Sequence, residues 1–301
     1  MSPLTWGRPL LSVVWLFILW VPVSQAEFVS GDCKRIVSLA PSITEVLDEI
    51  GIGSHVVGAT RYDSAIERSG VRSIGGFLDT NFEAMIQVHP SIVIALHEYT
   101  SLPQRLKSLG LTSITVDHRD IQGILDSISI IGSLCGKELE ANLLRTKLVD
   151  QQTKIEAEFR PLTERLADPA VLVVIGGVEG EGLSRSLYVS GKDGFYADLL
   201  SGLGFENAYR GLTASGATFS WEGIRSLKPF AIVHILPDSG TRVPSRNELA
   251  TMWKAVGLDQ VADRKRVFAL HDSSLIIPGP HYPIAQRILA ETLLEEVQDA
   301  E

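Results

Sequence analysis

The chain has 301 residues, of which 45% are hydrophobic and 21% charged, and it carries a formal net charge of −9 at pH 7. This length allows two domains of ordinary size or one large one. The acidic balance argues against a nucleic-acid partner, because no stripe of lysine and arginine with interleaved aromatic residues accompanies it.

The start of the chain has the pattern of an export signal. An apolar run extends over Leu10–Val23, and small residues occupy the −3 and −1 positions of a cleavage site that ends at Ala26. The run is shorter than the roughly 20 residues of a membrane-spanning helix. We therefore expect a cleaved signal peptide over residues 1–26 and an exported protein, with a retained anchor as the alternative. Because Asp32 precedes Cys33, lipid attachment at this cysteine is disfavoured.

Short apolar runs alternate with helix patterns in the next part of the chain. Residues 34–39 predict a buried strand, and residues 43–50 predict a helix for which Ser42 and Glu45 would form a capping box. Further strands are predicted at residues 55–59, 91–96 and 114–116. Strands that alternate with helices indicate a parallel sheet covered on both faces.

Residues 136–160 predict a long amphipathic helix, with apolar residues at helical spacing and charged or amide side chains on the other faces. At 1.5 Å per residue it would span roughly 35 Å. Neither glycine nor proline interrupts it before Pro161, where we expect it to end or kink. We interpret it as a rigid spacer between an N-terminal lobe, residues 27–135, and a C-terminal lobe, residues 161–301. One more crossover helix in a single sheet is the alternative.

The strand and helix pattern restarts after this helix, and one segment repeats. Strands are predicted at residues 170–175, 231–236 and 266–270, and helices at 194–201 and 283–297. Residues 81–90 match residues 220–229 at a constant offset of 139. Each copy has an N-cap, a short helix, a proline and a buried strand. We therefore predict an α/β fold with two similar Rossmann-like lobes, parallel sheets and one linking helix. Ligands of such sheets bind beyond the carboxyl ends of the strands, which here face the cleft between the lobes.

Five segments carry a resemblance to a known family: RIVSLAPSITEVLDEIG, NFEAMIQVHPSIVIA, VSGKDGFYADLLSGLGFENA, SWEGIRSLKPFAIV and RVFAL with GPHYPIAQRIL. In this order they resemble the helix-linked (class III) periplasmic substrate-binding proteins of ABC importers for cobalamin and ferric siderophores. The resemblance implies a periplasmic monomer that captures a cobalt corrinoid or an iron chelate between its lobes and delivers it to a permease dimer in the inner membrane. It implies no cofactor beyond this ligand. A haem-binding protein, or a free-standing chelate carrier that does not dock a permease, is the alternative.

The resemblance also implies that one glutamate at the tip of each lobe docks onto arginines of the permease, and Glu83 and Glu222 match these positions. A carboxylate that merely favours the dipole of its own helix is the alternative for either residue.

Aromatic side chains near strand ends are candidates for the wall of the cleft, because flat faces suit a large planar chelate. They are Tyr62, Phe77, Tyr188, Phe219 and Trp221. Phe195 is a further candidate, for which core packing is the better interpretation, and core packing is also an alternative for Trp221. Leu96 and Gly216 stand where the cobalamin-binding members that the chain resembles carry tryptophans.

Three loop histidines, His97, His271 and His281, are candidate axial ligands for the metal centre of a bound chelate. Arg61 and Arg185 could meet an anionic chelate. Simple solvation is the alternative for each loop histidine.

The two cysteines, Cys33 and Cys135, could form a disulfide that ties the first strand to the start of the long helix, or could remain buried thiols. We expect no catalysis and no metal site of the protein's own, because the sequence lacks G-x-S-x-G, H-E-x-x-H and P-loop motifs. An exported α/β hydrolase is a remote alternative.

Overall fold

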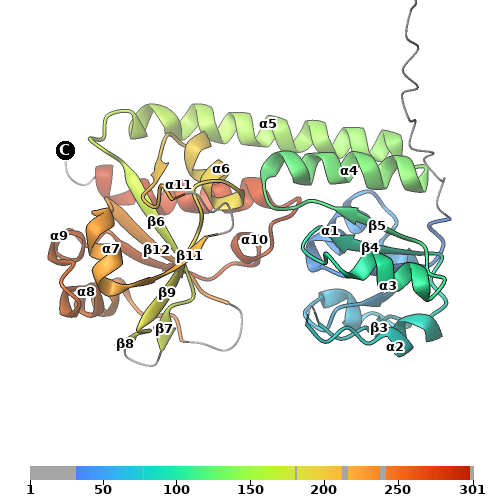
Figure 1. Ribbon diagram of the computed structural model, residues 1–301. Helices are drawn as coiled ribbons and strands as arrows, with labels where there is room; N and C mark the ends of the chain where they lie inside the picture. The colour runs from blue at the N-terminus through green and yellow to red at the C-terminus, as the bar shows by residue number, and fades with distance from the viewer. Residues whose placement is uncertain (1–31, 77, 180–181, 212–215, 238–241, 299–301) are drawn as a thin grey trace, which may run out of the picture.

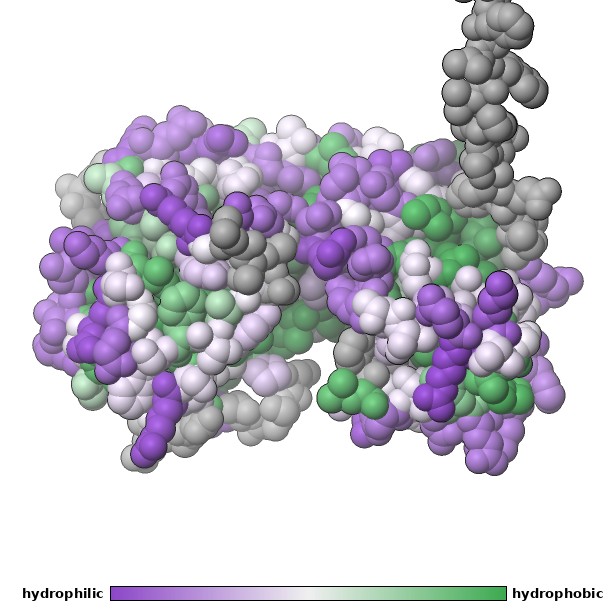
Figure 2. All heavy atoms as spheres, viewed as in Figure 1, coloured by the Kyte–Doolittle hydropathy of each residue, from purple (hydrophilic) through white to green (hydrophobic). Residues whose placement is uncertain are grey.

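The computed structural model describes residues 32–76, 78–179, 182–211, 216–237 and 242–298, so the predicted signal segment and Phe77 lie outside it. Two α/β lobes lie side by side, and one long helix runs along both of them (Figure 1). In the space-filling view the molecule is hollowed between the lobes (Figure 2). The predicted fold class is confirmed, with one correction: the second sheet is mixed rather than wholly parallel.

The N-terminal lobe has a five-stranded parallel sheet in the order β3-β2-β1-β4-β5. Its central strands are buried on both faces, as a parallel sheet between helices requires. The strands are β1 (Ile36–Ser38), β2 (Val56–Ala59), β3 (Arg72–Ser73), β4 (Ile92–Leu96) and β5 (Ser113–Val116). The helices are α1 (Pro41–Glu49), α2 (Phe82–Gln87), α3 (Leu102–Ser108) and α4 (Ile121–Cys135), with 3-10 turns η1 (Gly53–His55) and η2 (Ser64–Glu67).

The capping box predicted for α1 is wrong. The helix begins two residues earlier than expected, with Ala40 as N-cap and Pro41 in the first turn, where its missing N–H leaves no donor unsatisfied. Ser42 is thus inside the helix, and its hydroxyl lies 2.8 Å from Nδ1 of the buried His118.

The linking helix α5 runs over Glu138–Thr163 and pairs with α4, a helix that the sequence analysis did not predict. Gly136 adopts a left-handed conformation, with φ of 65°, and ends α4. A Cβ on Gly132 of α4 would lie 2.4 Å from the Cβ of Ala141, so a glycine allows the close approach of the two helices. Pro161 does not end α5, because the burial of Thr163 beyond it holds the last turn in place.

The C-terminal lobe has a six-stranded sheet in the order β11-β9-β6-β12-β13, with β10 also paired to β6. Strands β9 and β11 run antiparallel to their neighbours. The strands are β6 (Ala170–Ile175), β7 (Val178–Glu179), β8 (Gly182–Leu183), β9 (Ser186–Val189), β10 (Glu206–Asn207), β11 (Ala217–Ser220), β12 (Ala231–Ile235) and β13 (Val267–Leu270). The helices are α6 (Phe195–Gly202), α7 (Trp221–Leu227), α8 (Arg246–Ala255), α9 (Asp259–Asp263), α10 (Ser273–Ile276) and α11 (Tyr282–Gln298).

Helix α5 connects the two lobes by packing on a different partner at each end, α4 in the N-terminal lobe and α11 in the C-terminal lobe (Figure 1). Of the helices in the part of the chain that the structure describes, none has a stretch long and apolar enough to cross a membrane.

The predicted repeat is visible in the backbone. Asn81 caps α2 and Ser220 caps α7, each by accepting a hydrogen bond from the N–H three residues further on. After each helix the residue before the proline has a positive φ, 44° at His89 and 46° at Lys228. The two copies therefore share a helix, a stop and a following buried strand.

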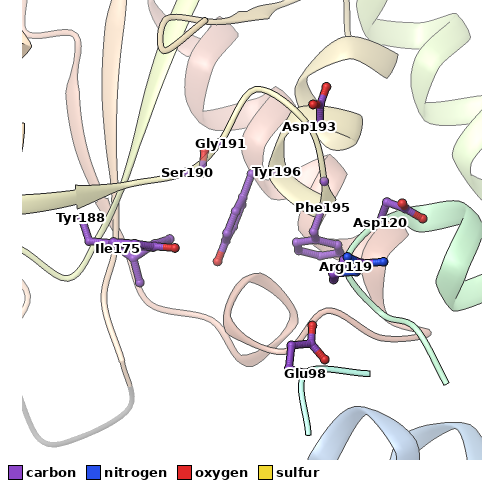
Figure 3. A pocket seen from close by; sticks show the side chains of 11 residues that line it. Glu98, Arg119, Asp120, Ile175, Tyr188, Ser190, Gly191, Asp193, Phe195 and Tyr196 are labelled. Atoms are coloured by element: carbon purple, nitrogen blue, oxygen red, sulfur yellow. The ribbon is translucent and has the colours of Figure 1, made fainter. Parts of the chain in front are cut away.

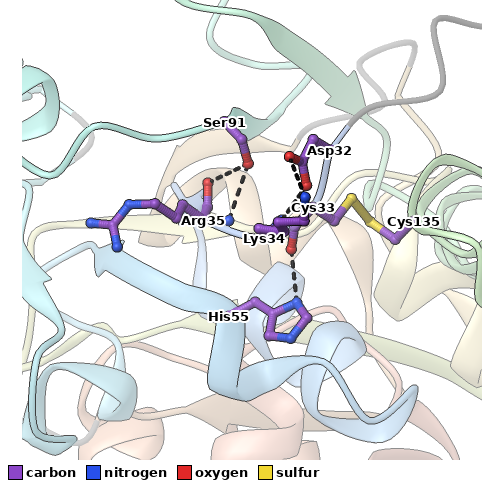
Figure 4. Close-up of a disulfide and its surroundings, with 7 residues drawn as sticks. All are labelled: Asp32, Cys33, Lys34, Arg35, His55, Ser91 and Cys135. Carbon is purple, nitrogen blue, oxygen red and sulfur yellow. Dashed lines mark hydrogen bonds and ion pairs between the residues drawn. A yellow bond between two sulfur atoms is a disulfide. The ribbon is translucent and has the colours of Figure 1, made fainter.

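Cys33 and Cys135 form a disulfide with a Cα–Cα distance of 5.3 Å (Figure 4). The bond ties the chain before β1 to the last residue of α4, not to the start of the long helix as predicted. Because the sulfur of Cys33 is bonded to Cys135, it does not carry a lipid. The ring Nδ1 of His55 lies 2.8 Å from the carbonyl oxygen of Cys33, so η1 also contacts the chain segment next to the disulfide (Figure 4).

Replacing both cysteines by serine should destabilise the protein, because the disulfide closes a sequence separation of 102 residues that covers the whole N-terminal sheet. We expect a loss of about 2–4 kcal/mol in the free energy of unfolding, measured as a lower guanidinium midpoint. Reduction of the unaltered protein should give the same loss. An unchanged midpoint in both experiments would contradict this prediction.

The cleft between the lobes as candidate functional site

A cavity of about 490 Å³ lies between the lobes, within the range of about 300–1,000 Å³ that is usual for small-molecule sites (Figure 3). Both lobes contribute to its wall, at the carboxyl ends of parallel strands and at the start of α6. This is where ligands of open α/β sheets bind. The lining residues are Glu98, Arg119 and Asp120 from the N-terminal lobe, and Ile175, Tyr188, Ser190, Gly191, Asp193, Gly194, Phe195 and Tyr196 from the other.

The floor of the cavity is a direct joint between the lobes. The N–H of Phe195, the first residue of α6, donates to the carbonyl oxygen of Arg119 over 2.6 Å. The carboxylate of Asp198 accepts a hydrogen bond of 2.9 Å from the N–H of Ile121, the first residue of α4. Burial raises the pKa of Asp198, whereas this hydrogen bond favours its charged form. Two helix N-termini from different lobes are therefore held against each other.

Aromatic side chains form the apolar part of the wall. Tyr188 on β9 lies opposite Ile175 of β6 in the antiparallel register, so both side chains are on the face of the sheet that borders the cavity. The hydroxyl of Tyr196 donates to the carbonyl oxygen of Leu275 over 2.7 Å, which fixes its ring. The rings of Phe195 and Tyr196 are edge-to-face, with centroids 5.3 Å apart. The wall thus presents fixed aromatic surfaces.

Two predicted wall residues, Phe219 and Trp221, lie elsewhere. Phe219 is paired with Leu187, so it is on the opposite face of the sheet from Tyr188, and its ring packs on Tyr209 at 5.0 Å. The indole of Trp221 donates to a backbone carbonyl before β9 over 2.8 Å and lines a separate groove against α8. Core packing, the alternative given above, therefore describes both side chains.

The side chains expected in the N-terminal loops do not line the cavity either. Tyr62, in the loop after β2, is 72% exposed. Its neighbour Arg61 forms an ion pair with Asp79, and Arg185 is exposed between β8 and β9.

The three predicted histidines do not converge. His97 is exposed beside Glu98, and His271 is exposed after β13. His281 lies where the lobes touch, with Nδ1 3.5 Å from Glu45 and Nε2 3.6 Å from Glu49, both on α1. Within the described residues, no three histidine, cysteine, aspartate or glutamate side chains are grouped so as to hold a metal ion.

Comparison with known proteins gives a family. A model of the periplasmic binding protein family matches residues 36–261, three quarters of the chain. The chain belongs to the periplasmic binding protein family. Its long linking helix places it among the helix-linked members.

The relatives and structural neighbours of this periplasmic binding protein are not all named for the same ligand. An uncharacterized ABC transporter substrate-binding lipoprotein, YvrC of Bacillus subtilis (strain 168), is 29% identical over 216 residues, which cover 70% of this chain and 66% of that protein. A cobalamin-binding protein of Halobacterium salinarum is 27% identical over 217 residues, 70% of this chain and 56% of that protein. The chain thus spans less than two thirds of either relative. A periplasmic heme binding protein from Pseudomonas aeruginosa has the same fold, with a TM-score of 0.70 at 21% identity. The match covers 86% of this chain and 92% of the heme binding protein.

The two repeated glutamates of this periplasmic binding protein are exposed on the first turns of α2 and α7. Glu83 accepts a hydrogen bond from Gln87 over 3.2 Å. Glu222 is 3.6 Å from Arg225, and hydrogen bonds to its own N–H and to Ser220 lower its pKa. Both carboxylates point out of the protein without a buried partner, so they are open to contact from another molecule.

Sequence reasoning missed several residues of the cavity. Arg119 and Asp120 follow the strand at β5 by a few residues, as polar side chains at the carboxyl end of a strand, and this signal was present in the sequence. Tyr196 and Asp193 begin a helix whose direction toward the other lobe depends on the joint with α4. No local pattern reveals that joint.

The pairing of His281 with α1 should make stability depend on pH. Contact with Glu45, and the charge of Glu49, raise the pKa of His281 above its ordinary value of 6.5. A raised folded-state pKa stabilises the fold below the unfolded pKa, and this contribution is lost as the pH rises through the folded pKa. His281→Gln should therefore destabilise the protein at pH 6 and have little effect at pH 9. We expect at most about 1 kcal/mol, because the partly exposed pair is screened by solvent.

Urea unfolding at the two pH values measures this effect, and His97→Gln is the control because His97 is exposed away from this joint. The same destabilisation by His281→Gln at pH 6 and pH 9 would show that the contact is not electrostatic.

Proposed function

We propose that the protein binds a metal chelate, a corrinoid or a ferric siderophore, between its lobes and delivers it to the permease of an ABC importer. The observation that supports this most is the cavity of about 490 Å³ with fixed aromatic walls, lined by both lobes of a periplasmic binding protein. Two relatives, one a substrate-binding lipoprotein of an ABC transporter and one named as cobalamin-binding, support the same proposal.

The wall suits a large ligand with a flat, partly apolar body. Tyr188 and Tyr196 offer ring area with few rotatable bonds, so little side-chain freedom is lost on binding. The hydroxyl of Tyr196 is already bonded to a backbone carbonyl, which leaves the ring face for the ligand. The protein contributes shape and polar contacts, and the metal is part of the cargo. We therefore propose binding without catalysis and without a resident cofactor.

Capture would require little movement of the lobes. Helix α5 packs on both lobes, and the contacts of Asp198 and His281 connect the lobes at two further points. A binding site that is formed before the ligand arrives loses less free energy on ordering. Release then depends on a partner that separates the lobes. In this mechanism the partner is the permease, and Glu83 and Glu222 are the residues that meet it.

The compartment we propose is the periplasm, reached through cleavage of the signal segment at residues 1–26. The disulfide between Cys33 and Cys135 supports this location, because structural disulfides persist in oxidising compartments. We propose that the protein acts there as a monomer, since one chain contributes both walls of the cavity.

Haem is the second candidate ligand, favoured by the shared fold with a periplasmic heme binding protein. Haem is also planar, but it carries two carboxylates, and the two arginines expected to meet an anionic ligand do not line the cavity.

Calorimetric titration with cyanocobalamin tests the proposed ligand class. We expect saturable binding at micromolar or lower concentration, and Tyr188→Ala should weaken it about tenfold by removing part of the aromatic wall. Calorimetry is preferable to tryptophan fluorescence, since Trp253 is fully buried and Trp221 faces the other side of the sheet. Trp221→Phe is the matched control and should bind normally. If cyanocobalamin, haemin and ferric siderophores all fail to bind, the proposed function is wrong.

Substitution of the docking residues separates an importer subunit from a free carrier. Glu83→Gln with Glu222→Gln should bind ligand normally, because neither residue lines the cavity, yet fail to support uptake in cells. Each single variant should retain part of the uptake. The stability loss should stay within some tenths of a kcal/mol, the usual contribution of a carboxylate to a helix dipole. Normal uptake by the double variant would favour the free carrier.

A further inference from the structure

The cavity carries an excess of negative charge. Glu98, Asp120 and Asp193 contribute three carboxylates to the described part of its wall, and Arg119 contributes the one guanidinium there. The wall therefore has two formal negative charges at neutral pH. Figure 3 shows the carboxylates at separate positions around the cavity rather than gathered at one point. We therefore expect the carboxylates to influence a ligand through their combined electrostatic field. Within the described residues they do not form a group that could hold a bare metal ion.

One edge of the Arg119 guanidinium is already paired with a carboxylate. Its Nε lies 2.9 Å from one oxygen of Asp117 and a terminal nitrogen lies 2.5 Å from the other, a two-point contact that lowers the pKa of Asp117. On the opposite side, Lys192 lies 3.8 Å from Asp193. Adding Asp117 and Lys192 to the wall leaves the excess unchanged, because their charges cancel. An anionic ligand would therefore have to share either cation with a carboxylate that already faces it.

Helix N-termini also attract anions, and two of them meet at the floor. Carboxylates already occupy the N-terminus of α4. Asp120 caps α4 by accepting from the N–H of Gly123 over 2.7 Å, and Asp198 accepts from the N–H of Ile121. The first N–H of α6 donates to the carbonyl oxygen of Arg119. The floor thus places two carboxylates at the N-terminus of α4, whereas the N-terminus of α6 has no side-chain cap.

Glu98 is the carboxylate of the wall that is best placed to act on a ligand. Unlike Asp120, which caps a helix, and Asp193, which faces Lys192, the carboxylate of Glu98 has no hydrogen bond or ion pair with a described residue, although its charge also acts on Arg119. It lies just beyond the carboxyl end of β4, at the N-terminal side of the cavity. Its charge is therefore directed at whatever occupies the space.

We propose, resting on the proposed function, that the cavity selects by charge. It accepts neutral or cationic chelates, such as an amidated corrinoid, and discriminates against chelates that carry free carboxylates, with Glu98 and Asp193 as the main determinants. Aromatic walls supply affinity for any flat ligand, whereas like charge suppresses the wrong ones. Among the candidate cargoes, this places an amidated corrinoid or a cationic hydroxamate chelate ahead of haem.

The sharpest test compares cyanocobalamin with its monocarboxylate derivative, in which one propionamide side chain is hydrolysed to a propionate. The two probes differ by one charge and hardly in shape. Calorimetry at low salt should show the monocarboxylate binding roughly fivefold weaker, by Coulomb repulsion from two net charges in a wet cavity. The ratio should shrink at 0.5 M salt, where screening is strong. Haemin and ferrioxamine B, an acidic and a cationic iron chelate, extend the comparison.

Substitutions in the cavity wall test whether its carboxylates cause the difference in affinity between the two corrinoids. Glu98→Gln with Asp193→Asn should bring the two corrinoids to within about twofold of each other and improve haemin binding. Glu138→Gln, which removes an exposed carboxylate at the start of α5, is the matched control and should keep the ratio of the unaltered protein.

The outcomes separate this inference from the proposed function. Equal binding of the two corrinoids, tighter binding of haemin than of the neutral and cationic probes, or a ratio that the wall variant leaves unchanged would overturn charge selection while chelate binding stands. Failure of all four probes would overturn the proposed function, and charge selection with it.

Discussion

The joint between the N-termini of α4 and α6 is the contact on which the site depends. Two helix N-termini carry partial positive charges and would repel each other if they met unmodified. Asp198 of one lobe accepts a hydrogen bond from α4 of the other, and the carbonyl oxygen of Arg119 accepts one from α6. Each helix N-terminus thus donates a hydrogen bond to an acceptor of the other lobe, and these two bonds make the contact favourable. Several residues of the cavity wall are sequence neighbours of the groups that form this joint: Arg119, Asp120, Asp193 and the aromatic residues at the start of α6. The hydrogen bonds that hold the lobes together therefore also fix the position of this wall.

Helix α5 and the joint have complementary effects on motion. A helix that packs on both lobes resists bending along its length, but by itself it would allow the lobes to twist about its axis. The hydrogen bonds at the floor, together with the contact of His281 with α1, oppose that twist at some distance from the helix. Opening the cleft must therefore break specific polar contacts rather than stretch a flexible linker. In the proposed mechanism the protein would therefore change shape little on binding and would rely on a partner for release.

The sequence predicts those parts of the structure whose signals are local. Buried strands, the long helix and the repeated cap, helix and proline follow from patterns within about ten residues, and the structure contains them. Helix α4 was missed although its signal is local: Ile121, Ile124 and Ile128 recur at helical spacing and are buried, as in an amphipathic helix. Phe219 was misplaced because its face depends on an antiparallel pairing that reverses the expected parallel sheet. His281 depends on a partner more than 200 residues away in the sequence.

The residues that hold the lobes together differ from the residues that we propose to select the ligand. The joint uses backbone groups and Asp198, whose loss would disturb the relation of the lobes. The wall charges of Glu98 and Asp193 lie in loops after strands and take no part in that joint. Substitutions there could change the charge of the preferred ligand and leave the fold intact. A fold shared with proteins named for haem and for cobalamin fits this separation, since in the proposed mechanism the aromatic walls would admit flat chelates and the loop charges would decide which one binds.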